Sequence, residues 1–296
     1  MPTIEYADGR RIRVPRGTTV LSASLGEQLD HAHACGGRGR CTTCRVLVEA
    51  GDAHCPPPTA AEAEALALNG LEAPIRLACQ LAPVGDVRVR VLIESHIAPC
   101  QSVPDAVEES VGVVFADLRG FTAFAEGRLP FDVCNVLNRY FDSMGVHVER
   151  NGGHILDYLG DGIMILFRPV DTEDPLRAAA RCSLDMQRAS ETFRRYVWKH
   201  FRGELRVGVA AHAGRAVVGA LGYFRNRQLN AVGDALNVVA RLESLNSELG
   251  TAVLFSAEVL DACRDFVEVG RQFELPVRGR AGAVTAYEVL GECGAA

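Results

Sequence analysis

The 296-residue sequence predicts an α+β protein of two domains, and two changes along the chain carry this prediction. Residues 1–98 combine short strand-like runs with a dense group of cysteines, whereas longer apolar strands alternate with longer helices from Val111 onward. Between these regions, residues 99–108 contain prolines and show no hydrophobic periodicity, which is typical of a linker. We therefore assign residues 1–98 to a first domain and residues 109–292 to a second.

Composition and charge narrow the classes of protein to which this chain can belong. Hydrophobic residues make up 48% and charged residues 23%, as in folded globular proteins. The net charge is −6 and no basic tract alternates with aromatic residues, so we do not expect a nucleic-acid partner. Residues 1–6 lack the pattern of a signal peptide, and no apolar run approaches the ~20 residues that span a bilayer. We therefore expect a cytoplasmic protein without a membrane span.

Short elements fill the first domain. Residues 7–10 form a predicted turn between two strands, and Thr19 is the predicted cap of a helix. The predicted elements are strands at Thr3–Tyr6 and Arg11–Val14, a helix at Thr19–Leu29, a strand at Arg45–Glu49, a helix at Thr59–Leu68 and a strand at Val87–Ile93.

Three of the ten cysteines, Cys35, Cys41 and Cys44, fall within ten residues with the spacing C-x5-C-x2-C. In a cytosolic chain such a group indicates metal or cofactor ligation rather than disulfides. The glycines between Cys35 and Cys41 let the backbone wrap tightly and point its N–H groups inward, where they stabilise negative charge on sulfur. A lone fourth cysteine, Cys79, follows in Leu-Ala-Cys-Gln.

This pattern resembles [2Fe–2S] ferredoxins, and its five-residue first gap is similar to the adrenodoxin-like branch. The resemblance covers roughly the first third of the chain and implies a small β-grasp fold, a [2Fe–2S] cluster and a protein redox partner. The implied cluster ligands are Cys35, Cys41, Cys44 and Cys79. A zinc site is the alternative because His31, His33 and His54 lie nearby, although zinc usually takes two C-x2-C pairs and only one is present.

Longer elements fill the second domain. Residues 155–167 predict a hairpin with its tip at Asp161, and Asp174 is the predicted cap of a helix with proline in its first turn. Cys134 and Cys182 fall in helical patterns, and we expect both to be small core residues. The predicted elements are a strand at Val111–Ala116, helices at Phe131–Glu149 and Pro175–His200, strands at Leu205–Ala211 and Leu229–Val232, and a helix at Ala235–Leu249.

Two acids end neighbouring elements of this domain. Asp117 follows the first strand, and Asp161 lies at the hairpin tip. An isolated Asp-Gly is more often only a turn, but two carboxylates at the ends of neighbouring strands could hold Mg²⁺ against a nucleotide phosphate. On the last helix, Asn237 and Arg241 are four residues apart and share one face. Taken alone, this pair would be solvated polar residues beside an apolar stripe.

Three stretches together resemble the class III nucleotidyl cyclases. Residues 115–122 resemble the first metal motif of that family, residues 160–162 the second, and residues 233–241 the transition-state motif. Their order and spacing match from about residue 109 to residue 290. The resemblance implies a ferredoxin-like βαββαβ fold and the conversion of a nucleoside triphosphate into a 3′,5′-cyclic monophosphate and pyrophosphate.

The resemblance also implies a role for each motif residue. Asp117 and Asp161 would hold two Mg²⁺ or Mn²⁺ ions, one acidifying the ribose 3′-hydroxyl and one anchoring the β- and γ-phosphates, with the Leu118 carbonyl as a further ligand. Amides of the loop that includes Phe121 and Thr122 would bind the triphosphate.

On the predicted helix at Ala235–Leu249, Arg241 would neutralise charge at the α-phosphate and Asn237 would orient the ribose. In this family the metal ligands and the Asn/Arg pair meet across a dimer interface. Because one chain carries all four residues, we expect a head-to-tail homodimer with two equivalent sites.

The two purine-reading positions, Asp157 and Asn230, depart from the usual adenine-reading pair of the family. Asp157 could accept hydrogen bonds from guanine N1–H and N2–H while Asn230 donates to O6, which favours GTP. Asn230 alone could instead donate to adenine N1 and accept from N6. Because cyclases with altered purine readers are mostly taken to use ATP, we expect cyclic AMP as the product, with cyclic GMP as the alternative.

Three roles for the whole chain remain open at this point. The first is a cyclase that is regulated by, or depends on, the cluster. The second is an electron-transfer protein with a catalytically inert cyclase-like dimerisation domain, and the complete metal and Asn/Arg set argues against it. In the third, the cluster only stabilises the first domain.

Overall fold

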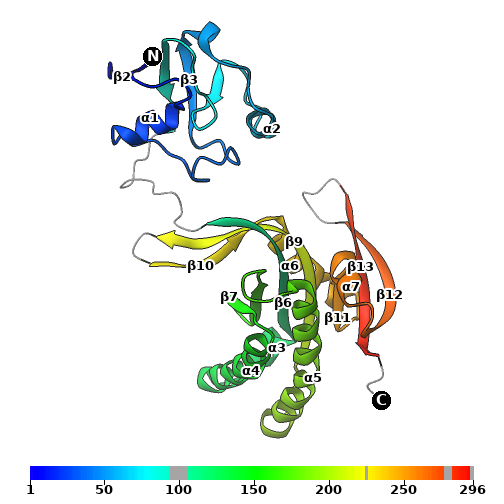
Figure 1. The fold of residues 1–296 in the computed structure, drawn as a ribbon. Coiled ribbons are helices and arrows are strands. Elements are labelled where there is room, and N and C mark those ends of the chain that lie inside the picture. The colour runs from blue at the N-terminus through cyan, green and yellow to red at the C-terminus, as the bar shows by residue number, and fades with distance from the viewer. Residues whose placement is uncertain (94–105, 224–225, 277–281, 294–296) are drawn as a thin grey trace. The chain divides into compact units, whose positions relative to one another are not determined.

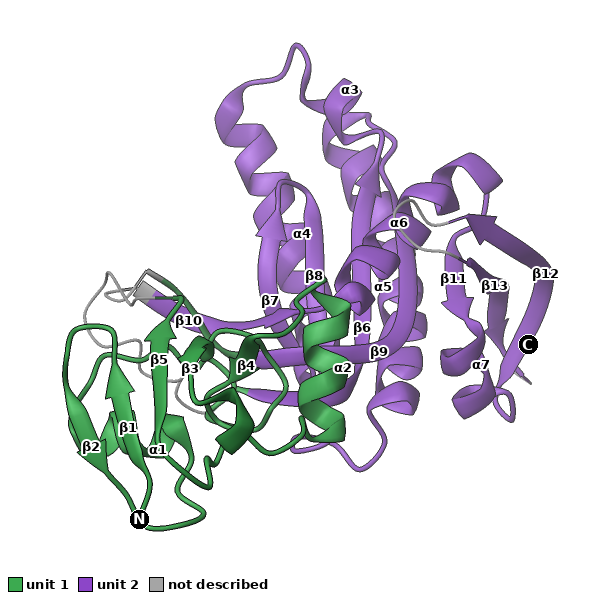
Figure 2. Ribbon diagram, turned by 90° about the horizontal axis from the view of Figure 1, so that it is seen from above, with its two compact units in different colours: residues 1–106, 219–222 green, residues 107–218, 223–296 purple. Residues whose placement is uncertain are grey.

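The computed structural model describes residues 1–93, 106–223, 226–276 and 282–293. The chain divides into two compact units, residues 1–106 with 219–222 and residues 107–218 with 223–296, which Figure 2 colours separately. Most of the predicted linker, residues 99–105, lies outside the described residues, whereas residues 107 and 108 already belong to a strand. No helix in the described ranges is both long enough and apolar enough to cross a membrane.

The first unit is a five-stranded mixed sheet in the order β2-β1-β5-β3-β4. Its strands and helices are β1 (Thr3–Tyr6), β2 (Arg11–Arg13), α1 (Val20–Gly26), β3 (Arg45–Ala50), η1 (Asp52–His54), α2 (Ala60–Leu68), β4 (Ile75–Leu77) and β5 (Val87–Val91). β1 runs parallel to β5 and the other pairs are antiparallel, which is the expected β-grasp arrangement. The Thr19 side chain accepts from the Ser22 amide, so the predicted cap is confirmed, although the helix ends at Gly26 rather than Leu29.

The second unit is an eight-stranded sheet in the order β12-β13-β11-β9-β6-β8-β7, with β10 paired to β9 (Figure 1). The elements are β6 (Val107–Arg119), α3 (Phe121–Ala125), α4 (Pro130–Arg150), β7 (His154–Leu159), β8 (Gly162–Phe167), α5 (Pro175–Phe201), β9 (Arg206–Tyr223), β10 (Asn226–Val232), α6 (Asp234–Leu249), β11 (Val253–Ser256), α7 (Ala257–Cys263), β12 (Val267–Pro276) and β13 (Ala283–Glu292). The central strands β9-β6-β8-β7 are all antiparallel and give the expected ferredoxin-like βαββαβ arrangement.

Alternate residues of β6 enter two different cores. Val114, Ala116 and Leu118 belong to the core that includes residues of α4 and α5, whereas Val111 and Val113 belong to the core that includes residues of α6. Figure 1 shows α4 and α5 running alongside each other. Because side chains alternate along a strand, Asp117 and Arg119 point to the α6 side of the sheet.

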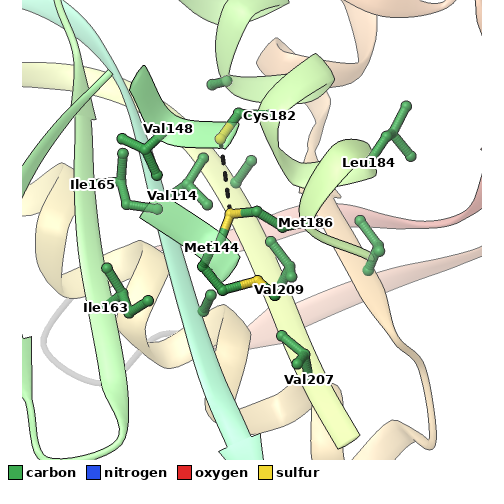
Figure 3. Close-up of a cluster of buried hydrophobic side chains, with 14 of the residues drawn as sticks. Val114, Met144, Val148, Ile163, Ile165, Cys182, Leu184, Met186, Val207 and Val209 are labelled. Carbon is green, nitrogen blue, oxygen red and sulfur yellow. Dashed lines mark hydrogen bonds between the residues drawn. The ribbon is translucent and has the colours of Figure 1, made fainter. Parts of the chain in front are cut away.

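Figure 3 shows the core on the α4 and α5 side, where Met144, Cys182 and Met186 meet aliphatic residues of the sheet. Cys182 is fully buried, as predicted, with its sulfur 3.7 Å from the Met186 sulfur. The same prediction is wrong for Cys134, which is exposed. The buried stripe of α4 runs through Val136, Tyr140, Met144 and Val148, and Cys134 lies outside this stripe.

Candidate functional site

The hairpin between β7 and β8 brings Asp161 to Asp117. Leu159 pairs with Gly162, so Gly160 and Asp161 form a two-residue turn, and Gly160 adopts a φ of +71° that glycine accommodates readily. A Cβ built on Gly162 would lie 3.3 Å from Oδ1 of Asp117. The two carboxyl groups hydrogen-bond to each other, and the backbone N–H of Leu118 donates to both.

This carboxyl pair is electrostatically unfavourable by itself. Burial, followed by the charge of Asp161, raises the pKa of Asp117 to about 6. Burial also raises the pKa of Asp161. Two carboxylates that disfavour each other's charge are suitable ligands for a hard divalent cation, which removes the repulsion. Among the described residues, no third His, Cys, Asp or Glu side chain joins these two carboxylates in a preformed metal site, so further ligands would come from the backbone, water or phosphate.

Two charged residues beside Asp117 were not predicted from the sequence. Glu243 on α6 is only 5% exposed, and a Cβ built on Gly208 would fall within 3.0 Å of Glu243 Oε1 and of Nε and Nη2 of Arg119. Gly208 of β9 is the register partner of Asp117. The polar ends of Glu243 and Arg119 therefore both lie close to this glycine, and the charge of Asp117 acts on each of them.

Burial is the main cause of the pKa shifts of Glu243 and Arg119. Burial and the charge of Asp117 raise the pKa of Glu243 to about 7, and burial lowers the pKa of Arg119. Nε and Nη2 of Arg119 are buried without a hydrogen-bond partner. The signal that could have revealed Glu243 is its spacing: it lies two residues after Arg241 and therefore on the opposite, buried face of α6.

Asn237 and Arg241 are exposed on α6 and do not join the carboxyl pair within the chain. In the part of the chain that the structure describes, neither side chain has a hydrogen bond or an ion pair. The structure thus brings two of the four predicted catalytic and metal-binding side chains together and leaves the other two exposed on α6.

The two purine-reading positions lie on strands that contact each other, β7 and β10. Asp157 is exposed, and its Oδ1 accepts from the Tyr158 amide at 2.9 Å. Asn230 is half-buried, and its Oδ1 accepts from the Ala231 amide at 2.7 Å. Each side chain keeps other polar atoms available for a base.

The other two predicted substrate-binding residues begin helix α3. Phe121 packs against the core beside α4, whereas Thr122 is exposed. The Thr122 hydroxyl and backbone are therefore the more accessible groups at this position.

In the first unit, the four predicted cluster ligands form two thiol pairs, Cys35 with Cys41 and Cys44 with Cys79. Within each pair, the hydrogen bond from the partner thiol lowers one pKa, to about 5 for Cys35 and about 6 for Cys79. The same bonds, together with burial, raise the pKa of Cys41 and of Cys44.

The loop between Cys35 and Cys41 supplies N–H donors to the sulfurs. Backbone N–H groups of residues 37, 38 and 40 point to Cys35, and that of residue 39 points to Cys79. Gly37 and Gly39 have φ values of +82° and +70°, which explains why glycine is needed there. The Gln80 amide adds a donor 3.6 Å from the Cys79 sulfur. These donors suit thiolates and sulfides, so the residues fit an anionic iron–sulfur cluster.

The histidines that made zinc an alternative have other partners. Both ring nitrogens of His31 are hydrogen-bonded, to Ser24 and to the Cys44 carbonyl. Nδ1 of His33 contacts the His31 carbonyl at 2.7 Å, and Nδ1 of His54 contacts the Asp86 carbonyl at 2.8 Å. His31 therefore has no nitrogen left for a metal, which weakens the case for zinc.

Comparison with known proteins confirms both family resemblances, one for each region of the chain. The model of the adenylate and guanylate cyclase catalytic domain matches residues 103–291, and that of the 2Fe-2S iron-sulfur cluster binding domain matches residues 5–84. Adenylate cyclase 1 of Rhizobium meliloti is 34% identical over 187 residues, which cover 63% of this chain but only 28% of that protein.

Two solved structures resemble the second unit. The guanylyl cyclase Cya2 matches with a TM-score of 0.60 and 30% identity over 64% of this chain and 96% of its own. The adenylyl cyclase CyaB from P. aeruginosa matches in fold, with a TM-score of 0.59 and 23% identity over 64% of this chain and 98% of its own. Because the cyclase model covers more than half of the sequence, the chain belongs to the adenylate and guanylate cyclase catalytic domain family, behind an N-terminal domain of the 2Fe-2S binding family.

Proposed function

We propose that this protein is a nucleotidyl cyclase that converts ATP into 3′,5′-cyclic AMP and pyrophosphate at two sites shared within a homodimer. The observation that carries the proposal is the division of groups within one chain. Asp117 and Asp161 form a carboxyl pair, while Asn237 and Arg241 lie exposed and unbonded in the described part of the chain. Each chain thus supplies two complementary half-sites.

In this proposal each half-site has a separate task. Asp117 and Asp161 would hold Mg²⁺ or Mn²⁺, which when bound supplies positive charge that acidifies the ribose 3′-hydroxyl and neutralises the triphosphate. The Arg241 guanidinium of the other chain would donate hydrogen bonds to oxygens of the α-phosphate, whose negative charge grows in the transition state. The Asn237 amide would fix the ribose by donating to its ring oxygen or by accepting from one of its hydroxyl groups.

Exposed apolar residues support a partner near the carboxyl pair. Tyr158 and Leu159 immediately precede the turn of Asp161, and they are 48% and 52% exposed. Leu229 and Val232 on the contacting strand β10 are also exposed. Apolar side chains gathered in this way usually mark an interface.

Complementation between inactive variants tests the shared sites. We expect Asp117→Ala and Arg241→Ala chains to be inactive alone and to give about a quarter of wild-type activity when mixed, since half of the dimers are mixed and each has one intact site. Mixing Asp117→Ala with Asp161→Ala should restore nothing, because both lesions lie in the same half-site. Equal behaviour of the two mixtures would refute the shared arrangement.

The names of the relatives and the residues at the purine-reading positions bear on the choice between ATP and GTP. The Rhizobium meliloti relative is named an adenylate cyclase, whereas Cya2 is named a guanylyl cyclase and the exposed Asp157 carboxylate suits guanine. Assays with ATP and GTP in parallel decide between the two. Higher kcat/KM with GTP would replace the adenylate assignment, and Asp157→Asn should then reduce GTP use more than ATP use.

We also propose that the four thiols hold a [2Fe–2S] cluster, one iron for each thiol pair, and that its redox state changes cyclase activity. The support is the pairing of Cys35 with Cys41 and of Cys44 with Cys79, together with the backbone N–H groups that donate to the Cys35 and Cys79 sulfurs. The test is a cyclase assay with the cluster oxidised and then reduced, with Asp161→Ala as a control that keeps the cluster spectrum and loses turnover. Equal rates in the two redox states would leave the cluster with a structural role only.

A further inference from the structure

A row of buried polar side chains runs through the first unit to a predicted cluster ligand. The Tyr6 hydroxyl lies 2.8 Å from Oγ of Ser24, and that Oγ lies 2.9 Å from Nδ1 of His31. Nε2 of His31 lies 3.1 Å from the backbone carbonyl oxygen of Cys44. Tyr6, Ser24 and His31 are all at most 4% exposed. A buried polar row of this kind is costly unless every group is paired.

The direction of each hydrogen bond in the row follows from the Cys44 carbonyl oxygen at its end. The Cys44 carbonyl can only accept, so Nε2 of His31 carries the hydrogen. Burial lowers the pKa of His31, which favours the neutral ring, and Nδ1 then accepts from the Ser24 hydroxyl. Ser24 shares that hydrogen with the Val20 carbonyl at 3.0 Å, and its oxygen accepts from the Tyr6 hydroxyl. Every polar atom of the row therefore has a partner.

The Cys44 carbonyl also receives a second donor, the Ala78 amide, at 3.1 Å. Ala78 immediately precedes Cys79, and His31 lies four residues before Cys35. This one carbonyl therefore joins the three chain segments that carry Cys35, Cys44 and Cys79. The Leu21 amide donates to the Ala78 carbonyl at 2.9 Å and ties the same point to α1.

We infer that His31 is a positioning residue for the iron–sulfur site, because its Nε2–H fixes the Cys44 backbone against Ala78 and draws electron density from the Cys44 amide. The inference rests on the proposed cluster. The residue acts through Cys44 and does not itself bind iron, since both of its ring nitrogens are occupied. Hydrogen bonds around metal ligands of this kind control both retention and reduction potential.

The test compares three variants of the full chain after anaerobic reconstitution with iron and sulfide. His31→Leu removes both hydrogen bonds, and we expect it to release iron to a chelator about tenfold faster than wild type and to be reduced at a lower potential. His31→Gln can accept from Ser24 and donate to Cys44, so it should restore both properties. His54→Leu is the matched control, because His54 is exposed and its ring meets the Asp86 carbonyl instead.

If His31→Leu releases iron at the same rate as the wild type and has the same reduction potential, the inference is overturned. A loss of thermal stability that leaves the potential unchanged would also overturn it, because that result describes a core residue only. If His31→Leu does not fold, Ser24→Ala provides the second test, since it removes the donor to Nδ1 and should shift the potential in the same direction. Failure of the wild-type chain itself to bind a cluster would instead refute the proposed cofactor.

Discussion

Gly208 shows how a single residue shapes the candidate active site. A Cβ there would fall within 3.0 Å of the polar ends of both Glu243 and Arg119. We expect Gly208→Ala to lower the free energy of unfolding by about 2 kcal/mol, as overpacking commonly does, and to reduce cyclase activity by displacing these two side chains next to Asp117, the register partner of Gly208. Urea unfolding and initial rates measure the two effects.

The matched control for Gly208→Ala lies within helix α4. A Cβ on Gly145 would meet only the Ile155 side chain, at 3.9 Å. Gly145→Ala should therefore stabilise the protein by roughly 0.5–1 kcal/mol, since alanine is the better helix former. If the two substitutions have the same effect, the crowding over Gly208 has no energetic importance.

Glu243 should also make stability depend on pH. Its pKa is raised from 4.5 to about 7, chiefly by burial, so the folded state prefers the protonated form. Its contribution to stability is fully present below pH 4.5 and is lost as the pH rises through about 7. We expect the metal-free wild type to lose up to about 3 kcal/mol over this window from this group, and Glu243→Gln to flatten the decline.

Thermal unfolding between about pH 5 and 8, with chelator present, measures the effect of Glu243. Glu248→Gln is the control, because Glu248 lies exposed on the same helix. Parallel pH profiles for wild type and Glu243→Gln would contradict the assignment.

At the scale of elements, the sequence predicted the helices well and the sheet only in part. The predicted helix at Phe131–Glu149 is one residue shorter than α4 at each end. The predicted helix at Pro175–His200 starts where α5 starts and ends one residue before it. The predicted strand Val111–Ala116 is shorter than β6, whose ends Val107 and Arg119 pair with Val218 and Arg206 of β9. Those added residues are held by pairing with a distant strand, which local periodicity does not report.

The last strands escaped prediction for a related reason. Eight of the ten positions of β12 are exposed or half-buried, so its sequence lacks the alternation that marks a half-buried strand. Its pairing with β13 depends on the rest of the sheet. Asp117, Asp161, Asn237 and Arg241 could be named as candidates from the sequence because they lie in recognisable motifs. Arg119 and Glu243 could not, because they lie close together only after β6, β9 and α6 come together.

The N-terminal caps of two helices offer a comparison of elements. The Asp174 side chain accepts from the Arg177 amide at 3.0 Å and begins α5, whereas Ser256 begins α7 without a side-chain cap bond. We expect Asp174→Ala to cost about 1 kcal/mol and Ser256→Ala to cost little, because the Ser256 hydroxyl is buried and unpaired. Denaturant midpoints give both values, and equal losses would contradict the role of the Asp174 cap.

At the scale of the whole molecule, each unit has its own sheet and core, so loss of the cluster should destabilise the first unit. We expect Cys79→Ser to prevent cluster binding and to lower the unfolding temperature of that unit. Cys55→Ser is the control, because the half-buried Cys55 thiol points to the Gly51 carbonyl at 3.8 Å and belongs to neither thiol pair. Visible absorbance and calorimetry follow the two properties, and cluster loss in Cys55→Ser would contradict the ligand assignment.

The exposed face of α6 that carries Asn237 and Arg241 has a kinetic consequence for the whole molecule. If a chain alone holds only half of each reaction centre, the number of working centres depends on encounters between copies. Below the dimerisation constant, turnover per chain should rise in proportion to protein concentration, and above that constant it should level off. A cell that doubles the copy number of this protein would then gain up to fourfold more cyclic nucleotide, so abundance itself becomes an input signal.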